Sequence, residues 1–192
     1  MHLSRLVCAL AMSSTGAMRF SAKHVFQRVW PGKWQLSRRI VSPGQADVFV
    51  EGYGSFVDGE GGGEGEGGGK QGVLQYSEVV AIAGAGEGTQ RYEYRWDATN
   101  SPDVITKYFH DGRLFYRLAT NVDGQLRAEE HLCVADLYVP EYEFESETAF
   151  RLTYAVCGPA KNYKIVTQFT KTANTSTAAV PLELSLDDKA ER

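Results

Sequence analysis

The stretch from Phe150 to Val156 reads FRLTYAV and places a large apolar side chain at every second position. Successive side chains of a β-strand point to opposite faces, so this period of two predicts a strand with one apolar and one polar face. The same alternation recurs in YEYRW at 92–96 and in YKIVTQF at 163–169. The chain is therefore expected to be built from strands.

Ten segments of this kind follow one another, with no convincing helix among them. We place them at about 34–42, 46–56, 73–82, 90–97, 103–110, 113–119, 125–134, 137–145, 149–157 and 162–171. Tight-turn residues separate several of them, at Ser42-Pro43-Gly44, Asp111-Gly112, Asp123-Gly124 and Gly158-Pro159. A meander of so many strands usually closes on itself and leaves no exposed edge. We predict an all-β fold, an antiparallel up-and-down β-barrel of about ten strands.

The sequence divides into three parts. Residues 1–25 form a leader, 26–171 the barrel with a short helical lead-in, and 172–192 a tail expected to be disordered. A glycine-rich insertion at 59–72 contains nine glycines in 14 positions. Its matches to G-x-G-x-x-G follow from glycine density, and no helix pattern follows that would present its N-terminus to a phosphate.

Charge is unevenly distributed along the chain. The first 46 residues contain seven Lys and Arg and no acidic residue, which leaves 13 basic against 24 acidic residues in the remainder, a net charge of −11. Phosphate binding needs clustered basic side chains, so nucleic acid is not expected as a partner. No stretch of sequence approaches the ~20 apolar residues of a membrane-spanning helix.

The leader suggests an address. It contains Arg5, Arg19 and Lys23, several Ser and Thr residues and no acid, which is the composition of a mitochondrial transit peptide. The alternatives are a leader without an address, which leaves the protein cytoplasmic, and a secretory signal whose apolar region, residues 6–12, is short. We predict a mitochondrial location.

Gly32-x-Trp34 opens the first expected strand. In lipocalin-like barrels such a tryptophan lies across the closed end, covered by a cationic side chain from the last strand. Lys171 is expected in that role here, with Lys161 or Lys164 as alternatives.

His131-x-Cys133-x-x-Asp136-x-Tyr138 is the string richest in chemistry. Cys133 beside His131 suggests a thiolate nucleophile. A metal site is not expected, because zinc needs four ligands and no second Cys and His pair exists. The same groups can bind the polar end of a small molecule, or form a polar network that fixes strand register.

Aromatic and polar side chains recur on the faces expected to point inward. A lumen lined with many tyrosines resembles an amphipathic ligand pocket more than a filled core. Arg113 either reaches into the barrel mouth as an anion-binding group or pairs with Asp111 on the surface. The predicted ligand-binding residues are Tyr76, Glu78, Tyr92, Tyr94, Trp96, Arg113, Tyr116, His131, Cys133, Asp136 and Tyr138.

Six motifs in this order resemble a lipocalin-like, calycin-type domain family of unknown function. They are Gly32-x-Trp34-x-Leu36-x-Arg38-x-Ile40, Leu74-x-Tyr76-x-Glu78, Tyr92-x-Tyr94-x-Trp96, Phe109-x-Asp111-Gly112-Arg113-x-Phe115, the His131 string and Gly158-Pro159-x-Lys161-x-Tyr163. The resemblance covers residues 26–171. It implies a small barrel of about ten strands and supplies no activity.

Three functions remain open on the sequence alone. The first is a small-molecule binding barrel for an aromatic or amphipathic ligand, with haem as one candidate because His131 or His110 can serve as axial ligand. The second is an enzyme with His131 and Asp136 as acid and base and Arg113 as anion stabiliser. The third is an accessory subunit of an organellar complex that docks through its acidic outer face.

Overall fold

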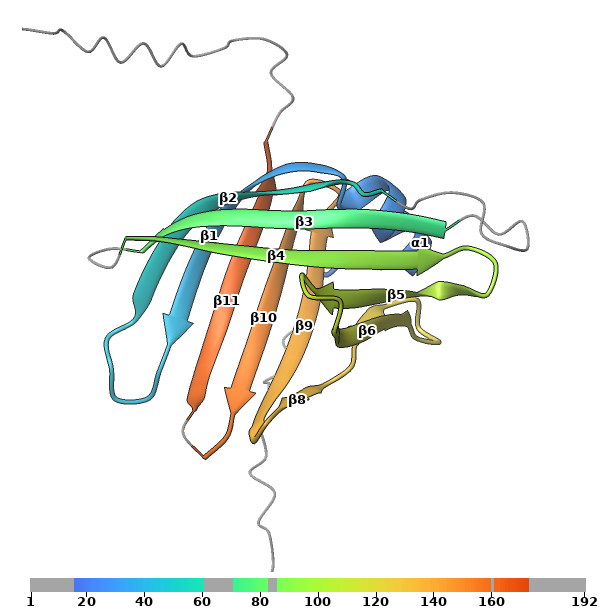
Figure 1. Ribbon diagram of the computed structural model, residues 1–192. Coiled ribbons are helices and arrows are strands. Elements are labelled where there is room, and N and C mark those ends of the chain that lie inside the picture. Colours follow the sequence, from blue (N-terminus) through green and yellow to red (C-terminus); the bar gives the residue numbers. More distant parts are fainter. Residues whose placement is uncertain (1–15, 61–70, 83–85, 160, 173–192) are drawn as a thin grey trace, which may run out of the picture.

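The computed structural model describes residues 16–60, 71–82, 86–159 and 161–172 (Figure 1). Residues 173–192 of the predicted tail, most of the glycine-rich insertion and residues 1–15 of the leader lie outside these ranges. These described residues form eleven strands: β1 (Gly32–Val41), β2 (Val48–Asp58), β3 (Gln71–Ile82), β4 (Gly86–Asp97), β5 (Ser101–Phe109), β6 (Leu114–Thr120), β7 (Leu126–Ala128), β8 (His131–Cys133), β9 (Asp136–Ser146), β10 (Ala149–Cys157) and β11 (Asn162–Lys171).

All strands belong to one antiparallel sheet in the order β7-β6-β5-β4-β3-β2-β1-β11-β10-β9-β8. The first and last long strands are neighbours, with Leu36 opposite Phe169. The sheet curls into a half-barrel, so that β3 and β4 cross over β9, β10 and β11 in Figure 1. The predicted all-β, up-and-down barrel is thus confirmed.

The segment predicted as one strand at 125–134 is two short strands in the structure. Strand β7 pairs with β6 at one edge of the sheet, and β8 pairs with β9 at the other edge. The chain therefore crosses from edge to edge through Glu129 and Glu130, which brings the two edges close together. Val134, at φ 59°, makes the bend between β8 and β9. The alternation was a poor guide here because both strands span only three residues.

Helical turns plug one end of the curled sheet. Helix α1 (Ala22–His24) continues into a π-helix, η1 (Val25–Val29), and Ala22 and Val25 are fully buried. Ahead of them Met18 forms a β-bridge with Phe144. The packed part of the chain thus begins before the predicted boundary at residue 26. In the described ranges, no helix is long and apolar enough to cross a membrane.

Trp34 seals this end of the barrel. Its indole Nε1 donates to the carbonyl oxygen of Trp30 at 2.8 Å, and its ring meets Phe150 edge-on at 4.9 Å. Lys171 Nζ lies 5.2 Å from the Trp34 ring centroid and donates to the carbonyl oxygen of Val29 at 2.7 Å. The predicted cation–π contact is confirmed for Lys171.

Aromatic rings fill the space above this plug. Trp30 stacks on Phe56 at 5.3 Å between centroids, and Phe150 stacks on Phe169 at 4.3 Å. Offset and edge-on ring contacts of this kind stabilise a core beyond the area they bury. Beyond these rings the two walls of the curled sheet separate and leave a cavity.

Candidate functional site

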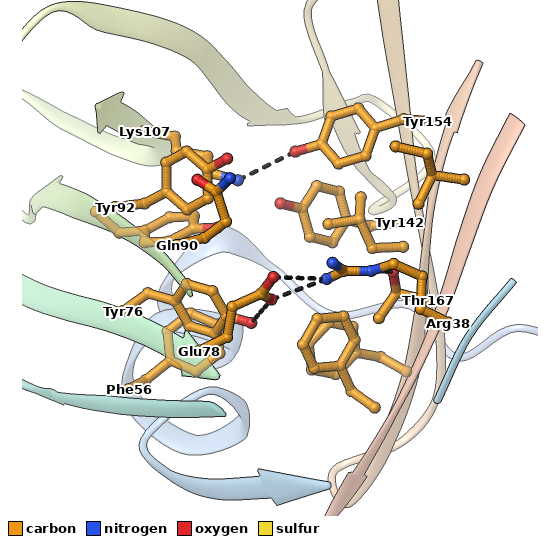
Figure 2. Close-up of a pocket in the computed structure, with 15 residues that line it drawn as sticks. Arg38, Phe56, Tyr76, Glu78, Gln90, Tyr92, Lys107, Tyr142, Tyr154 and Thr167 are labelled. Carbon is orange, nitrogen blue, oxygen red and sulfur yellow. Dashed lines mark hydrogen bonds and ion pairs between the residues drawn. The ribbon is translucent and has the colours of Figure 1, made fainter. Parts of the chain in front are cut away.

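The cavity has a volume of about 150 Å³ and lies between β1 to β5 on one side and β9 to β11 on the other (Figure 2). Most of its lining is aromatic or aliphatic. Its polar lining consists of Arg38, Glu78, Gln90, Lys107, Thr167 and the hydroxyls of several tyrosines. Gln90 is exposed and Arg38 half-buried, so the cavity opens to solvent beside these two residues.

An ion pair crosses the cavity between Arg38 on β1 and Glu78 on β3. Arg38 Nη2 donates to both carboxylate oxygens of Glu78, at 2.8 and 2.9 Å, and Nε donates to Thr167 Oγ1 at 2.9 Å. The Tyr76 hydroxyl donates to the same carboxylate at 2.5 Å. Only 18% of the Arg38 side chain and 4% of the Glu78 side chain are exposed. Charges this deep persist only when they are paired and hydrogen-bonded, as these are.

A glycine on β2 makes room for this pair. Strand β2 lies between β1 and β3, and Gly54 faces the lumen beneath the ring of Tyr76. A Cβ atom at Gly54 would lie 3.0 Å from the Tyr76 hydroxyl and 3.2 Å from Leu36 Cδ1. The missing side chain thus lets Tyr76 lie across β2 and reach Glu78.

Lys107 on β5 is the second buried charge, with only 2% of its surface exposed. Its Nζ lies 3.8 Å from the ring centroid of Tyr92 and within 5.7 Å of four more ring centroids. Nζ also donates to the hydroxyls of Tyr154 at 3.1 Å and Tyr116 at 3.3 Å. Aromatic rings and tyrosine hydroxyls therefore surround this amine (Figure 2). A buried lysine more commonly pairs with a carboxylate.

This environment changes the acidity of both the amine and the phenols. Burial lowers the pKa of Lys107, Glu78 opposes this and Arg38 adds to it, and together they bring the pKa to about 7. Burial also raises the pKa of Tyr116 and Tyr154 well above the usual value of a phenol. At neutral pH the cavity therefore contains an amine that is neutral in part of the molecules, beside hydroxyls that keep their protons.

The structure brings five of the predicted ligand-binding residues together here. Tyr76, Glu78, Tyr92 and Tyr94 line the cavity, and the Tyr116 hydroxyl accepts a hydrogen bond from Lys107. Trp96 is also buried, but its ring packs against Phe26 of the helical plug, 5.8 Å between centroids. Its Nε1 donates to the carbonyl oxygen of Pro102 at 2.8 Å.

Arg113 does not reach the barrel mouth. Its Nε donates to Asp111 Oδ2 at 2.8 Å and 74% of its side chain is exposed. Arg113 lies in the turn just before β6, where both its backbone N–H and its Nε donate to the Asp111 carboxylate, so its guanidinium stays at the surface. The alternative expectation, a surface ion pair with Asp111, describes the structure.

The His131 string lies outside the cavity lining in the described structure. The His131 ring meets Phe115 edge-on at 4.9 Å, and Cys133 is exposed. Asp136 accepts from Lys161 Nζ at 2.8 Å, and Lys161 also donates to the Tyr138 hydroxyl at 3.1 Å. Cross-strand register sets Cys133 opposite Asp136 and His131 opposite Tyr138. Asp136 therefore pairs with Lys161 and not, as expected, with His131.

Sequence reasoning missed Arg38, Lys107, Tyr142, Tyr154 and Thr167 as cavity residues. The signal was present for the two cations. Arg38 has the same parity as Trp34 and Leu36, and Lys107 the same parity as Ile105, so both fall on the inward face of their strands. Among the described residues, His, Cys, Asp and Glu form no cluster of three that could hold a metal ion.

The sequence profile of DUF6314, described as a family of unknown function, matches residues 30–171. No curated protein matches the chain significantly. Among solved structures, the S-type phycobiliprotein lyase CPES from Guillardia theta aligns with a TM-score of 0.63 and 8% identity, over 81% of this chain and 94% of the lyase. A redesigned β-barrel aligns with a TM-score of 0.39 and 11% identity, over 80% of this chain and 97% of that chain. The likeness to the lyase establishes a shared barrel fold.

Proposed function

We propose that this chain, which belongs to the DUF6314 family, binds a compact aromatic or amphipathic molecule in its lumen. The observation that carries the proposal is the burial of Arg38, Glu78 and Lys107 in an aromatic cavity. Burying charged groups costs free energy that an aliphatic core would not incur. Ligand sites characteristically combine apolar walls with a few polar groups that orient the bound molecule.

The size of the cavity limits the ligand. Its 150 Å³ is below the roughly 300–1,000 Å³ of drug-sized ligand sites, and similar to engineered cavities that take up benzene. A single-ring molecule fits this volume, as does the end of a longer molecule that leaves past Gln90. The ring would lie against tyrosine faces, with its polar group directed to Lys107 and the hydroxyls beside it.

One solved structure that shares the fold is described as a phycobiliprotein lyase. This description supports a ligand-binding role for the barrel in general terms. Haem, one predicted ligand, is not favoured, because neither His110 nor His131 lines the cavity of the described structure. The cavity volume favours a molecule smaller than haem.

Two experiments test the proposal. Native mass spectrometry of gently purified protein should detect a non-covalent small molecule, and saturation-transfer NMR should detect binding of single-ring probes such as benzoate, phenol and benzaldehyde. Leu152→Phe is the matched control, because Leu152 lines the cavity and a larger side chain there fills it. Equal signals from the wild type and a folded Leu152→Phe variant would place binding elsewhere and refute the proposal.

A further inference from the structure

We propose that Lys107 captures a carbonyl compound, an aldehyde or ketone, as an imine inside the barrel. The inference rests on the proposed ligand-binding function and names the chemical class of the ligand. Three features of the site support it: where the amine points, which protonation state the site favours, and which groups surround the reacting atoms.

The first feature is position. Lys107 Nζ faces the cavity from β5, with the Tyr92 ring 3.8 Å away on one side and the Tyr154 hydroxyl 3.1 Å away on another. A planar ligand that enters past Gln90 would bring its polar end to this amine. Holding the two reacting groups together in one small cavity greatly favours bond formation.

The second feature is protonation. Only the neutral amine carries the lone pair that attacks a carbonyl carbon, and lysines that form imines in enzymes are commonly desolvated in apolar pockets. Burial gives Lys107 a pKa of about 7, so part of the protein holds the reactive form at neutral pH. A cation meant only to anchor an anion would be better supplied by arginine, which stays charged.

The third feature is the group of hydroxyls around Nζ. The Tyr116 hydroxyl is hydrogen-bonded to the hydroxyls of Tyr154 at 2.7 Å and Tyr142 at 2.8 Å. Their raised pKa values keep them protonated, so they can donate to an oxygen that gains negative charge. The addition of an amine to a carbonyl group needs such a donor close to the attacking nitrogen, because the carbonyl oxygen becomes negatively charged.

The reaction balances without a co-reactant. The Nζ lone pair forms a bond to the carbonyl carbon as the C=O π bond opens, and one proton of the nitrogen passes by way of the tyrosine hydroxyls to the oxygen to give a carbinolamine. The nitrogen then forms the C=N double bond as the C–O bond breaks, and the hydroxyl leaves as water with the second proton of the nitrogen. One amine and one carbonyl compound give one imine and one water, with no change in oxidation state. Protonation of this imine by solvent gives an iminium, which would keep the cation–π contact with Tyr92.

The test traps the imine by reduction. The full chain is incubated at pH 7 with limiting benzaldehyde and sodium cyanoborohydride, and the modified lysines are identified by peptide mass spectrometry. We expect the first benzyl group on each modified chain to be on Lys107, formed at least about tenfold faster than at the exposed Lys33 and Lys164, because burial favours the neutral, reactive amine at Lys107. Lys107→Arg keeps the cation and should lose the rapid adduct.

Benzyl alcohol separates the two proposals, because it has the same ring and cannot form an imine. Benzyl alcohol and benzaldehyde that both bind by saturation-transfer NMR, without a preferred adduct at Lys107, would overturn the inference and leave the ligand-binding function standing. Failure of both probes to bind, together with no Lys107 adduct, would count against both. The wild-type peptide map needs no variant, so a poorly folded Lys107→Arg protein does not weaken the test.

Discussion

Arg38 and Arg39 are adjacent in β1, and their guanidinium groups lie on opposite faces of the sheet. Arg38 pairs with Glu78 inside the barrel, while Arg39 pairs with Asp47 outside, where 57% of the arginine side chain is exposed. The same two chemical groups thus form one buried and one exposed ion pair on a single strand. This arrangement allows the free energy of the buried pair to be measured against a control in the same protein.

Glu78→Gln should destabilise the fold by about 3 kcal/mol or more, because it leaves Arg38 buried without its counter-charge. Asp47→Asn should cost at most about 1 kcal/mol, since water screens the exposed pair. Urea denaturation of both variants at pH 7 measures the two free energies of unfolding. Equal costs would mean that the lumen is more hydrated than the structure indicates.

Lys107 should make stability depend on pH. Its pKa is about 7 in the fold and ~10.4 in the unfolded chain, so between these values the unfolded state binds more protons. The free energy of unfolding therefore increases with pH across this window, by about 2 kcal/mol from pH 7 to pH 9 on account of this residue. Below pH 7 the cost of charging the buried amine is fully present.

Lys107→Met removes this titration, and the difference in unfolding free energy between wild type and variant should change over that pH range. Lys164→Met, which removes an exposed amine, should leave the pH dependence of wild type unchanged. A pH-independent difference for Lys107→Met would show that the amine is hydrated in the folded protein.

The plug end should be separable from the ligand site. Lys171→Met removes the cation over Trp34 and the hydrogen bond to Val29, and should cost roughly 1–2 kcal/mol. Binding of single-ring probes should be unaffected, because Lys171 is not part of the cavity lining in the described structure. A loss of both stability and binding would indicate that the plug and the cavity form one unit.

Arg113→Ala should leave probe binding and stability unchanged within about 0.5 kcal/mol, because it removes an exposed ion pair. Tyr92→Leu, in contrast, removes a ring from the cavity wall and should weaken probe binding about tenfold, by analogy with other buried aromatic contacts. Thermal shift and saturation-transfer NMR on both variants check this. A stronger effect of Arg113→Ala on binding would restore the original prediction for that residue.

The mitochondrial address remains a prediction from composition. Met18 forms a β-bridge with Phe144, and Ala22 and Val25 are fully buried, so removal of a transit peptide should occur before Met18. A fusion of residues 1–25 to a fluorescent protein should enter mitochondria, and N-terminal sequencing of imported full-length chain should find a start ahead of residue 18. Uniform cytosolic fluorescence would favour the cytoplasmic alternative.

The sequence predicted the walls of the barrel well, because each long strand repeats its apolar phase several times. The turns at Gly44, Gly112 and Gly124 all have the positive φ that the turn residues indicate. The sequence-based prediction failed between residues 125 and 134, where two three-residue strands, β7 and β8, lie at opposite edges of the sheet. Alternation over so few residues does not show which partner a strand will take.

The candidate site was predicted in part. The aromatic motifs on β3 and β4 identified Tyr76, Glu78, Tyr92 and Tyr94, because period two fixes which face each side chain takes. The His131 string drew attention because it gathers reactive residue types within eight positions, yet its first part forms β8, which lies at a sheet edge. Lys107 was overlooked because a single lysine among apolar residues is more often a surface residue than a buried one.

A ring-shaped ligand bound in the lumen between Glu78 and Lys107 can be located by diffraction. Crystals of the protein are soaked with 4-bromobenzyl alcohol, and the bromine atom is located by its anomalous signal. A bromine peak is expected inside the cavity, with the hydroxyl of the probe directed toward Lys107 Nζ. A fully soaked crystal with bromine bound only on the outer surface, and none in the cavity, would contradict it.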